Sequence, residues 1–105
     1  VYIDERLKDY LIQIASATRQ PRAFRMESLA PFIAYGASPR ATIFLAQASQ
    51  GHAFLDGRSY VTPDDIKAVA PDVLRHRLVL TYEAEAEEIS ADAIVARVLA
   101  GVEVP

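Results

Sequence analysis

The run Gly36-Ala37-Ser38-Pro39-Arg40 is the part of this sequence that most directly indicates chemistry. Ser38 is a residue type that accepts backbone N–H bonds at a helix start, and Pro39 suits the first helical position because it has no N–H to leave unpaired. Arg40 then falls in the first turn, where the exposed N–H groups carry roughly half a positive elementary charge. An arginine is disfavoured there unless an anion lies opposite, so the run predicts an anion site.

Gly36 fits the same interpretation. It permits a backbone turn with positive φ, and it permits a close approach that a residue with a Cβ would block. Phosphate is an anion that such a helix start can bind, which makes Gly36, Ser38 and Arg40 candidate binding residues. The alternative is an ordinary solvated arginine whose stem lies along its helix, since serine-proline helix starts are common.

Other catalytic and metal-binding patterns are absent. The sequence has neither a phosphate loop of the Gly-x-x-x-x-Gly-Lys-Ser/Thr kind nor a dinucleotide fingerprint, so we do not expect it to hydrolyse nucleotide by itself. His52 and His76 lack metal-ligand spacing, and we expect surface or hydrogen-bonding roles for them. Asp64 and Asp65 are adjacent and point in different directions on a helix, so capping explains them better than acid–base catalysis.

Composition narrows the function classes further. The chain has 105 residues, of which 51% are hydrophobic, and this suffices for a single domain spanning residues 1–105. The absence of cysteine excludes disulfides and thiolate metal sites and fits a reducing cytoplasm. With a net charge of −3 there is no global basic field for nucleic acid or anionic lipid, and no apolar run is long enough to span a membrane. We therefore expect neither nucleic acid nor a membrane as partner.

Four helices dominate the expected fold. The first runs from about Asp4 to Arg19, with apolar residues at three- and four-residue spacing. The second runs from Ser38 to about Leu55, the third starts at Thr62-Pro63, and Ser90 caps the last. The residues expected on the buried side of the second helix are Ala41, Phe44, Leu45, Ala48 and Leu55.

Several connecting features are also predicted. Asp56-Gly57 should end the second helix, with a residue that tolerates the left-handed conformation, and Pro71 indicates a kink or a restart in the third. The β-branched and apolar run 78–82 is expected to form a short strand paired with residues 33–35. The expected fold class is therefore mainly α, with a short two-stranded β piece.

Most aromatic residues fall on or beside the predicted core stripes, including Tyr10 on the first helix. An alternative role for Tyr10 is stacking on an adenine ring, which makes it a further candidate for nucleotide binding.

Four sequence blocks together resemble one family. They are Ala17-Thr18-Arg19, Gly36-Ala37-Ser38-Pro39-Arg40-Ala41, the stretch 57–66 (GRSYVTPDDI) and the stretch 73–78 (VLRHRL). In this order they resemble the C-terminal lid of MoxR-type AAA+ ATPases, over nearly the whole chain. Tyr35, where an aliphatic residue is usual, and Gln50-Gly51-His52, in place of a more alanine-rich run, are the departures from the pattern.

This resemblance implies a function. The motif ending in Arg40 carries the sensor 2 arginine of that family, which reaches the nucleotide phosphates, so Arg40 inherits a catalytic role by position. The implied cofactor is ATP, with Mg²⁺ held by an AAA+ core that lies N-terminal to Val1. The implied partners are that core, neighbouring subunits in a ring, commonly a hexamer, and client protein complexes that are remodelled or assembled. Whether Arg40 acts on nucleotide of its own or of a neighbouring subunit stays open.

Three further arginines match recurring family positions, namely Arg19, Arg58 and Arg77. For each, the favoured role is a structural ion pair, with carboxylates such as Asp64 or Asp56, rather than a nucleotide contact.

Two other classes of protein remain as alternatives. One is a self-standing helical module that binds a partner helix without nucleotide. The other is a histone-like DNA binder, suggested by the run 60–66 (YVTPDDI) before a helix, although the acidic balance argues against it.

Overall fold

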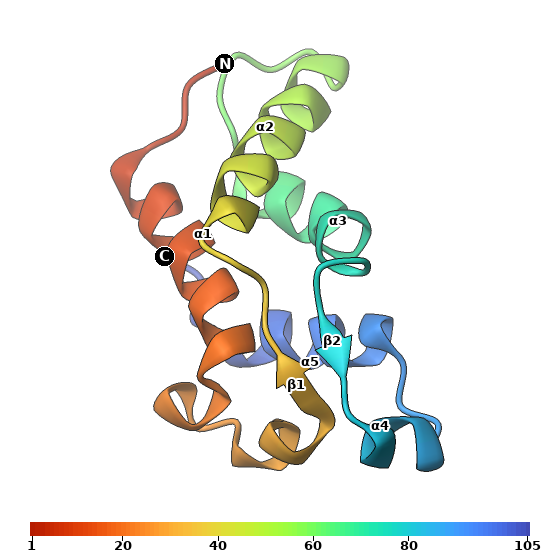
Figure 1. The fold of residues 1–105 in the computed structure, drawn as a ribbon. Helices are drawn as coiled ribbons and strands as arrows, with labels where there is room; N and C mark the ends of the chain where they lie inside the picture. Colours follow the sequence, from red (N-terminus) through yellow and green to blue (C-terminus); the bar gives the residue numbers. More distant parts are fainter.

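The structure is a computed structural model that describes all 105 residues. It is mainly α-helical, as predicted, with four α-helices of eleven or more residues and one shorter helix. Figure 1 shows how they are arranged. The helices are α1 (Glu5–Arg19), α2 (Arg40–Leu55), α3 (Pro63–Leu74), α4 (Tyr82–Ala86) and α5 (Ala91–Gly101), with two 3₁₀ segments at Pro21–Phe24 and Glu27–Phe32.

Helix α1 begins and ends where the periodicity predicts. Asp4 is its N-cap and accepts a hydrogen bond from the backbone N–H of Arg6. The buried stripe of α1 includes Tyr10, Leu11 and Ile14, which belong to a core cluster of 21 buried residues contributed by most of the chain. The cluster also takes in α2, α3 and α5.

Helix α2 buries a narrower stripe than predicted. Its buried residues are Ala41, Leu45, Ser49 and Ala53, four residues apart, and α2 packs along α3. Three of these four side chains are small, which permits a close approach between helices. Phe44 is 40% exposed and Leu55 is 86% exposed, so the prediction that both are buried is wrong.

Helix α3 continues through Pro71, so the predicted restart is not observed. Pro63 is its first residue and Thr62 its N-cap, in agreement with the expected start. Helix α5 follows Ser90, whose hydroxyl accepts a hydrogen bond from the Ala93 N–H, again as predicted. Gly57 lies just past α2 with a φ of +79°, the left-handed conformation expected there.

The predicted β piece is present. Strands β1 (Ile33–Tyr35) and β2 (Val79–Leu80) pair in antiparallel fashion, with Ile33 opposite Leu80 and Tyr35 opposite Val79. Figure 1 shows them side by side, below the start of α2.

A second pairing fastens the amino end of the chain. Tyr2 forms an isolated parallel bridge with Tyr60, beyond the end of α2. The Tyr2 N–H donates to the Ser59 carbonyl at 2.8 Å, and the Val61 N–H donates to the Tyr2 carbonyl at 2.9 Å. None of the helices combines the length and the apolar composition needed to cross a membrane.

Candidate functional site

The loop before α2 lies against the last turn of α1. Both backbone groups of Ala37, which is fully buried, are bonded by consecutive side chains of α1. The Ala37 N–H donates to Thr18 Oγ1 at 2.9 Å, and the Ala37 carbonyl accepts from the Arg19 guanidinium at 2.8 Å. The loop is therefore placed by α1 at the point where α2 begins.

Gly36 lies next to this pair of bonds. A Cβ at Gly36 would overlap the backbone carbonyl of Thr18, so the predicted close approach exists, and it is made to the end of α1. The predicted positive φ is wrong, because Gly57 is the glycine with that conformation. Gly36 is required here for packing between two backbone segments.

The start of α2 differs from its predicted form at Ser38. Pro39 already has helical dihedrals (φ −55°, ψ −25°), and α2 begins at Arg40 with no side-chain cap. The Ser38 carbonyl accepts from the Ala41 N–H at 2.9 Å, while its hydroxyl caps nothing. The expected Ser38 cap is therefore wrong, because the turn around Pro39 uses the main-chain oxygen of Ser38 instead.

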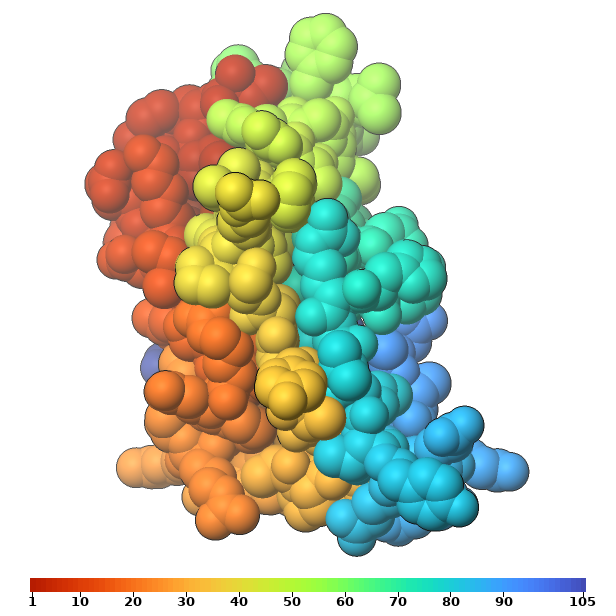
Figure 2. Space-filling model, in the orientation of Figure 1, coloured from red at the N-terminus to blue at the C-terminus, as the bar shows by residue number.

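The Arg40 side chain is exposed and makes no hydrogen bond or ion pair within the chain. It occupies the first position of a 16-residue helix whose first turn contains no acidic residue. Its positive charge therefore adds to that of the uncapped helix terminus. Figure 2 shows the yellow beginning of α2 uncovered on one face of the molecule, between the end of α1 and the segment around residues 75–80. This is the electrostatic arrangement that an anion would stabilise.

Tyr10 lies in the core. Its side chain is 1% exposed, so no face of the ring is open to stack on a base. Its hydroxyl has no hydrogen-bond partner, and burial raises the pKa of the Tyr10 phenol. The core position matches the first of the two roles considered for this residue.

The start of α3 contains a dense charged network around Asp65, whose side chain has no exposed surface. Asp65 accepts two bonds from the Arg58 guanidinium, at 2.5 and 2.6 Å, and one from the Thr62 N–H at 2.7 Å. His52 Nδ1 lies 2.7 Å from the same carboxylate. Arg58 and these other partners lower the pKa of Asp65, and Arg58 has its own pKa raised by Asp65 and by Asp56.

The three remaining family-matched arginines thus have different partners. Arg58 forms the expected structural ion pair, with Asp65 and Asp56. Arg77 lies over the Phe44 ring, 4.4 Å from its centroid, and donates to the Val73 carbonyl. For Arg77 and for Arg19, the ion-pair expectation is wrong, because their partners are uncharged: a backbone carbonyl and an aromatic ring for Arg77, and a backbone carbonyl and the Ser16 hydroxyl for Arg19.

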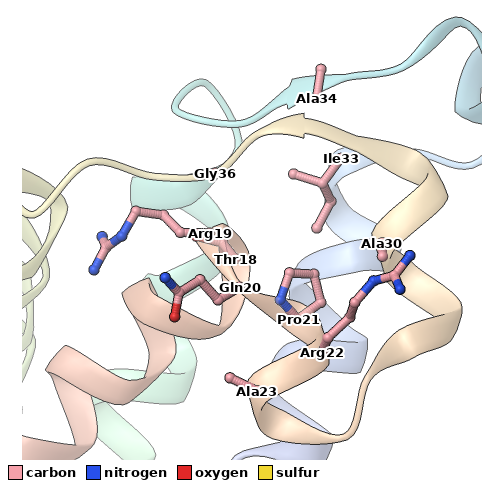
Figure 3. A pocket seen from close by; sticks show the side chains of 10 residues that line it. All are labelled: Thr18, Arg19, Gln20, Pro21, Arg22, Ala23, Ala30, Ile33, Ala34 and Gly36. Atoms are coloured by element: carbon pink, nitrogen blue, oxygen red, sulfur yellow. The ribbon is translucent and has the colours of Figure 1, made fainter.

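A groove of about 530 Å³ runs beside the end of α1, and its walls include Arg19, Gln20, Arg22 and Ile33. Figure 3 shows the Arg19 and Arg22 side chains extending to opposite sides of it. The two guanidinium groups therefore do not converge on one ligand. No group of three potential metal-ligating side chains lies together elsewhere in the structure.

Thr18 is the residue of this region to which sequence reasoning gave no role of its own. The sequence feature that could have identified Thr18 is its place in the block Ala17-Thr18-Arg19, eighteen residues before Gly36. A buried hydroxyl at a helix end needs a partner, and the loop carrying Gly36 supplies one.

Comparison with known proteins agrees with this architecture. The model of the AAA lid domain family matches residues 25–98. Chaperone MoxR1 of Mycobacterium tuberculosis is 44% identical over 99% of this chain. Protein MoxR of Methylorubrum extorquens is 44% identical over 56% of this chain.

A solved structure of a candidate ATPase from Cytophaga hutchinsonii superposes with a TM-score of 0.96 at 46% identity, over all of this chain. The chain spans only part of these longer proteins, namely 28% of MoxR1 and 32% of the Cytophaga protein.

Proposed function

The chain belongs to the AAA lid domain family, within the group that contains the MoxR proteins, and from that premise we propose that it contributes Arg40 as a phosphate-contacting arginine to an ATPase. In this proposal Arg40 has the sensor 2 role. Its guanidinium neutralises charge that develops on the transferred phosphoryl group, which its fixed fork of donors does better than a lysine would.

The observation that carries the proposal is that the Arg40 guanidinium, at the start of α2, has no partner within the chain. Arg58, Arg75 and Arg6 are each paired with a carboxylate of the chain. Arg40 shares the lack of such a partner with other arginines, Arg22 among them, but it lies in the first turn of a long α-helix, whose terminus repels it. The unbonded hydroxyl of Ser38 is two residues away and offers one more donor to the same anion. Gly36 contributes by letting the loop lie close against α1.

The rest of the ATPase lies outside this chain in the proposal. An AAA+ core N-terminal to residue 1 supplies the phosphate loop and the acid that binds Mg²⁺, and ATP is bound between core and lid. The lid moves relative to the core as nucleotide turns over, within a cytoplasmic ring of subunits, commonly a hexamer. The work performed is the remodelling or assembly of client protein complexes, in keeping with the name of the related chaperone MoxR1.

Arg40→Ala in the complete ATPase tests the proposal. We expect ATP turnover to fall by about tenfold or more, because charge stabilisation of the phosphoryl group is lost while no internal contact is removed. Steady-state turnover and a thermal melt of the same preparation are the measurements. Arg22→Ala is the matched control, because the Arg22 side chain is also exposed and makes no hydrogen bond or ion pair within the chain.

Wild-type turnover in Arg40→Ala would refute the assignment. The lid alone is expected neither to hydrolyse ATP nor to bind it tightly, since it has no phosphate loop. Turnover by the purified 105-residue chain would contradict the division of roles between lid and core.

A further inference from the structure

The contacts between α1 and the loop before α2 are unusual in being made to the backbone of a single residue. Ala37 donates its N–H to Thr18 and accepts at its carbonyl from Arg19. Two adjacent side chains therefore fix both the position and the orientation of one peptide segment. Gly36 adds a third restraint, because its backbone packs on that of Thr18 too closely for a Cβ.

The direction of each bond is determined by chemistry. The Thr18 hydroxyl donates to the Ala15 carbonyl at 2.6 Å, so its oxygen is free to accept the Ala37 N–H. The Arg19 guanidinium has no acceptor atom and can only donate, which suits the Ala37 carbonyl. A second nitrogen of Arg19 donates to Ser16 Oγ at 3.1 Å, which steadies the side chain against its own helix.

The restraint on Ala37 extends directly to Arg40. Pro39 has a fixed φ, and the N–H groups of Ala41 and Thr42 bond the carbonyls of Ser38 and Pro39 at 2.9 and 3.1 Å. No freely rotating segment therefore separates Ala37 from the first turn of α2. Any loosening at Ala37 must also change the direction from which the Arg40 side chain starts.

We infer that Thr18 and Arg19 are positioning residues for Arg40, acting through the backbone of Ala37. They touch neither nucleotide nor phosphate in this account. They fix the backbone from which the Arg40 side chain extends, which reduces the space that its guanidinium must search to meet the phosphoryl group. The inference rests on the proposed function, since it assigns these residues to the same site.

Thr18→Val in the complete ATPase is the first test, because valine keeps the shape of threonine and removes the hydroxyl. We expect kcat for ATP to fall by about tenfold while KM changes by less than about threefold, since the affected contact strengthens in the transition state. Thr18→Ser restores the hydroxyl and should return kcat to within about twofold of wild type.

A double variant separates positioning from a general loss of structure. If Thr18 acts through Arg40, then Thr18→Val combined with Arg40→Ala should turn over within about twofold of Arg40→Ala alone. A merely structural effect of Thr18→Val would multiply with that of Arg40→Ala. Multiplied effects, or wild-type kcat in Thr18→Val, would overturn the inference.

Arg19→Met provides an independent variant that does not disturb the core, because Arg19 is exposed. Methionine keeps an aliphatic stem and cannot donate to the Ala37 carbonyl, so we expect a fall in kcat of about threefold. Arg22→Met is its control and should have wild-type kcat, since Arg22 makes no bond to the loop. Equal kcat values for the two variants would count against the role of Arg19.

Amide hydrogen exchange distinguishes failure of this inference from failure of the proposed function. Thr18→Val should speed exchange of the Ala37 amide by about tenfold, whatever Arg40 does in catalysis, because this amide bonds the Thr18 hydroxyl. Unchanged exchange would refute the restraint itself. If ATP turnover is slow in Arg40→Ala but at the wild-type rate in Thr18→Val, only the positioning role is refuted. If turnover is at the wild-type rate in Arg40→Ala, both proposals are refuted.

Discussion

The starts of α2 and α3 have similar sequences, but the charges in their first turns have opposite sign, and only at α3 does a charged residue have partners within the chain. Both place a hydroxyl residue before a proline and a charged residue after it, as Ser38-Pro39-Arg40 and as Thr62-Pro63-Asp64. At α3 the charges complement the helix terminus and one of them, Asp65, is buried with three partners. At α2 the charge opposes the terminus, lies exposed and has no partner.

This difference shows which helix start contributes internal hydrogen bonds and ion pairs to stability and which one leaves polar groups available to a ligand. The α3 start satisfies its own donors, so a ligand there would have to break bonds that already exist. At the α2 start the Ser38 hydroxyl and the Arg40 guanidinium have no hydrogen-bond partner within the chain, so a ligand that bound these two groups would break no existing bond. An arginine with no internal partner at a helix start is an arrangement that a bound anion would stabilise.

Asp65→Asn should cause the largest loss of stability, because it removes the charged network that distinguishes the α3 start from the α2 start. The amide carries no charge to pair with Arg58, which keeps only its exposed partner Asp56, and removing the buried member of an ion pair costs about 3 kcal/mol in the free energy of unfolding. Urea unfolding of the wild-type and variant chains measures this loss. Asp64→Asn is the control, because Asp64 is exposed in the same helical turn and should cost only about 0.5 kcal/mol. Similar losses in the two variants would mean that the Asp65 network is not the stabilising element.

The pH dependence of stability tests the same network at the α3 start. The pKa of Asp65 is below its ordinary value of 3.8 in the folded chain, chiefly because of Arg58, so its contribution to stability is fully present above pH 3.8. That contribution is lost as the pH falls through the lower, folded pKa. Wild-type stability should therefore decrease below pH 3.8 more steeply than that of Asp65→Asn. Parallel curves from unfolding titrations at pH 2 to 5 would contradict this.

The smallest expected effect concerns the two hydroxyl residues. Thr62→Ala removes a hydroxyl that bonds Asp65 at 3.0 Å and should cost about 1 kcal/mol in the free energy of unfolding. Ser38→Ala removes a hydroxyl without an internal bond and should cost less than about 0.5 kcal/mol. Equal costs, measured by urea unfolding, would show that the two starts are capped alike.

Most helix starts and ends were readable from the sequence because local chemistry sets them, although the expected Ser38 cap was wrong. The proline at position 63, the cap at Ser90 and the left-handed glycine at position 57 all depend on neighbouring residues only. The pairing of β1 with β2 followed from strand propensity in two short runs.

What the sequence did not determine depends on packing between distant segments. The buried face of α2 was misjudged at Phe44 and Leu55, because apolar character does not show which side another helix will approach. Three of the four buried side chains of α2 are small, and Phe44 lies instead beneath Arg77. The partners of Arg40 remain a prediction, since its role depends on a phosphate and a core domain outside this chain.

The bridge between Tyr2 and Tyr60 has a mechanical consequence. It ties the amino end of the chain to the carboxyl end of α2, while Thr18 and Arg19 tie the carboxyl end of α1 to the amino end of α2. Hydrogen bonds thus connect α2 to α1 and its leading segment at both ends of α2, which is about 24 Å long. Arg40 therefore lies at the end of α2 opposite to the one that contacts the amino end of the chain.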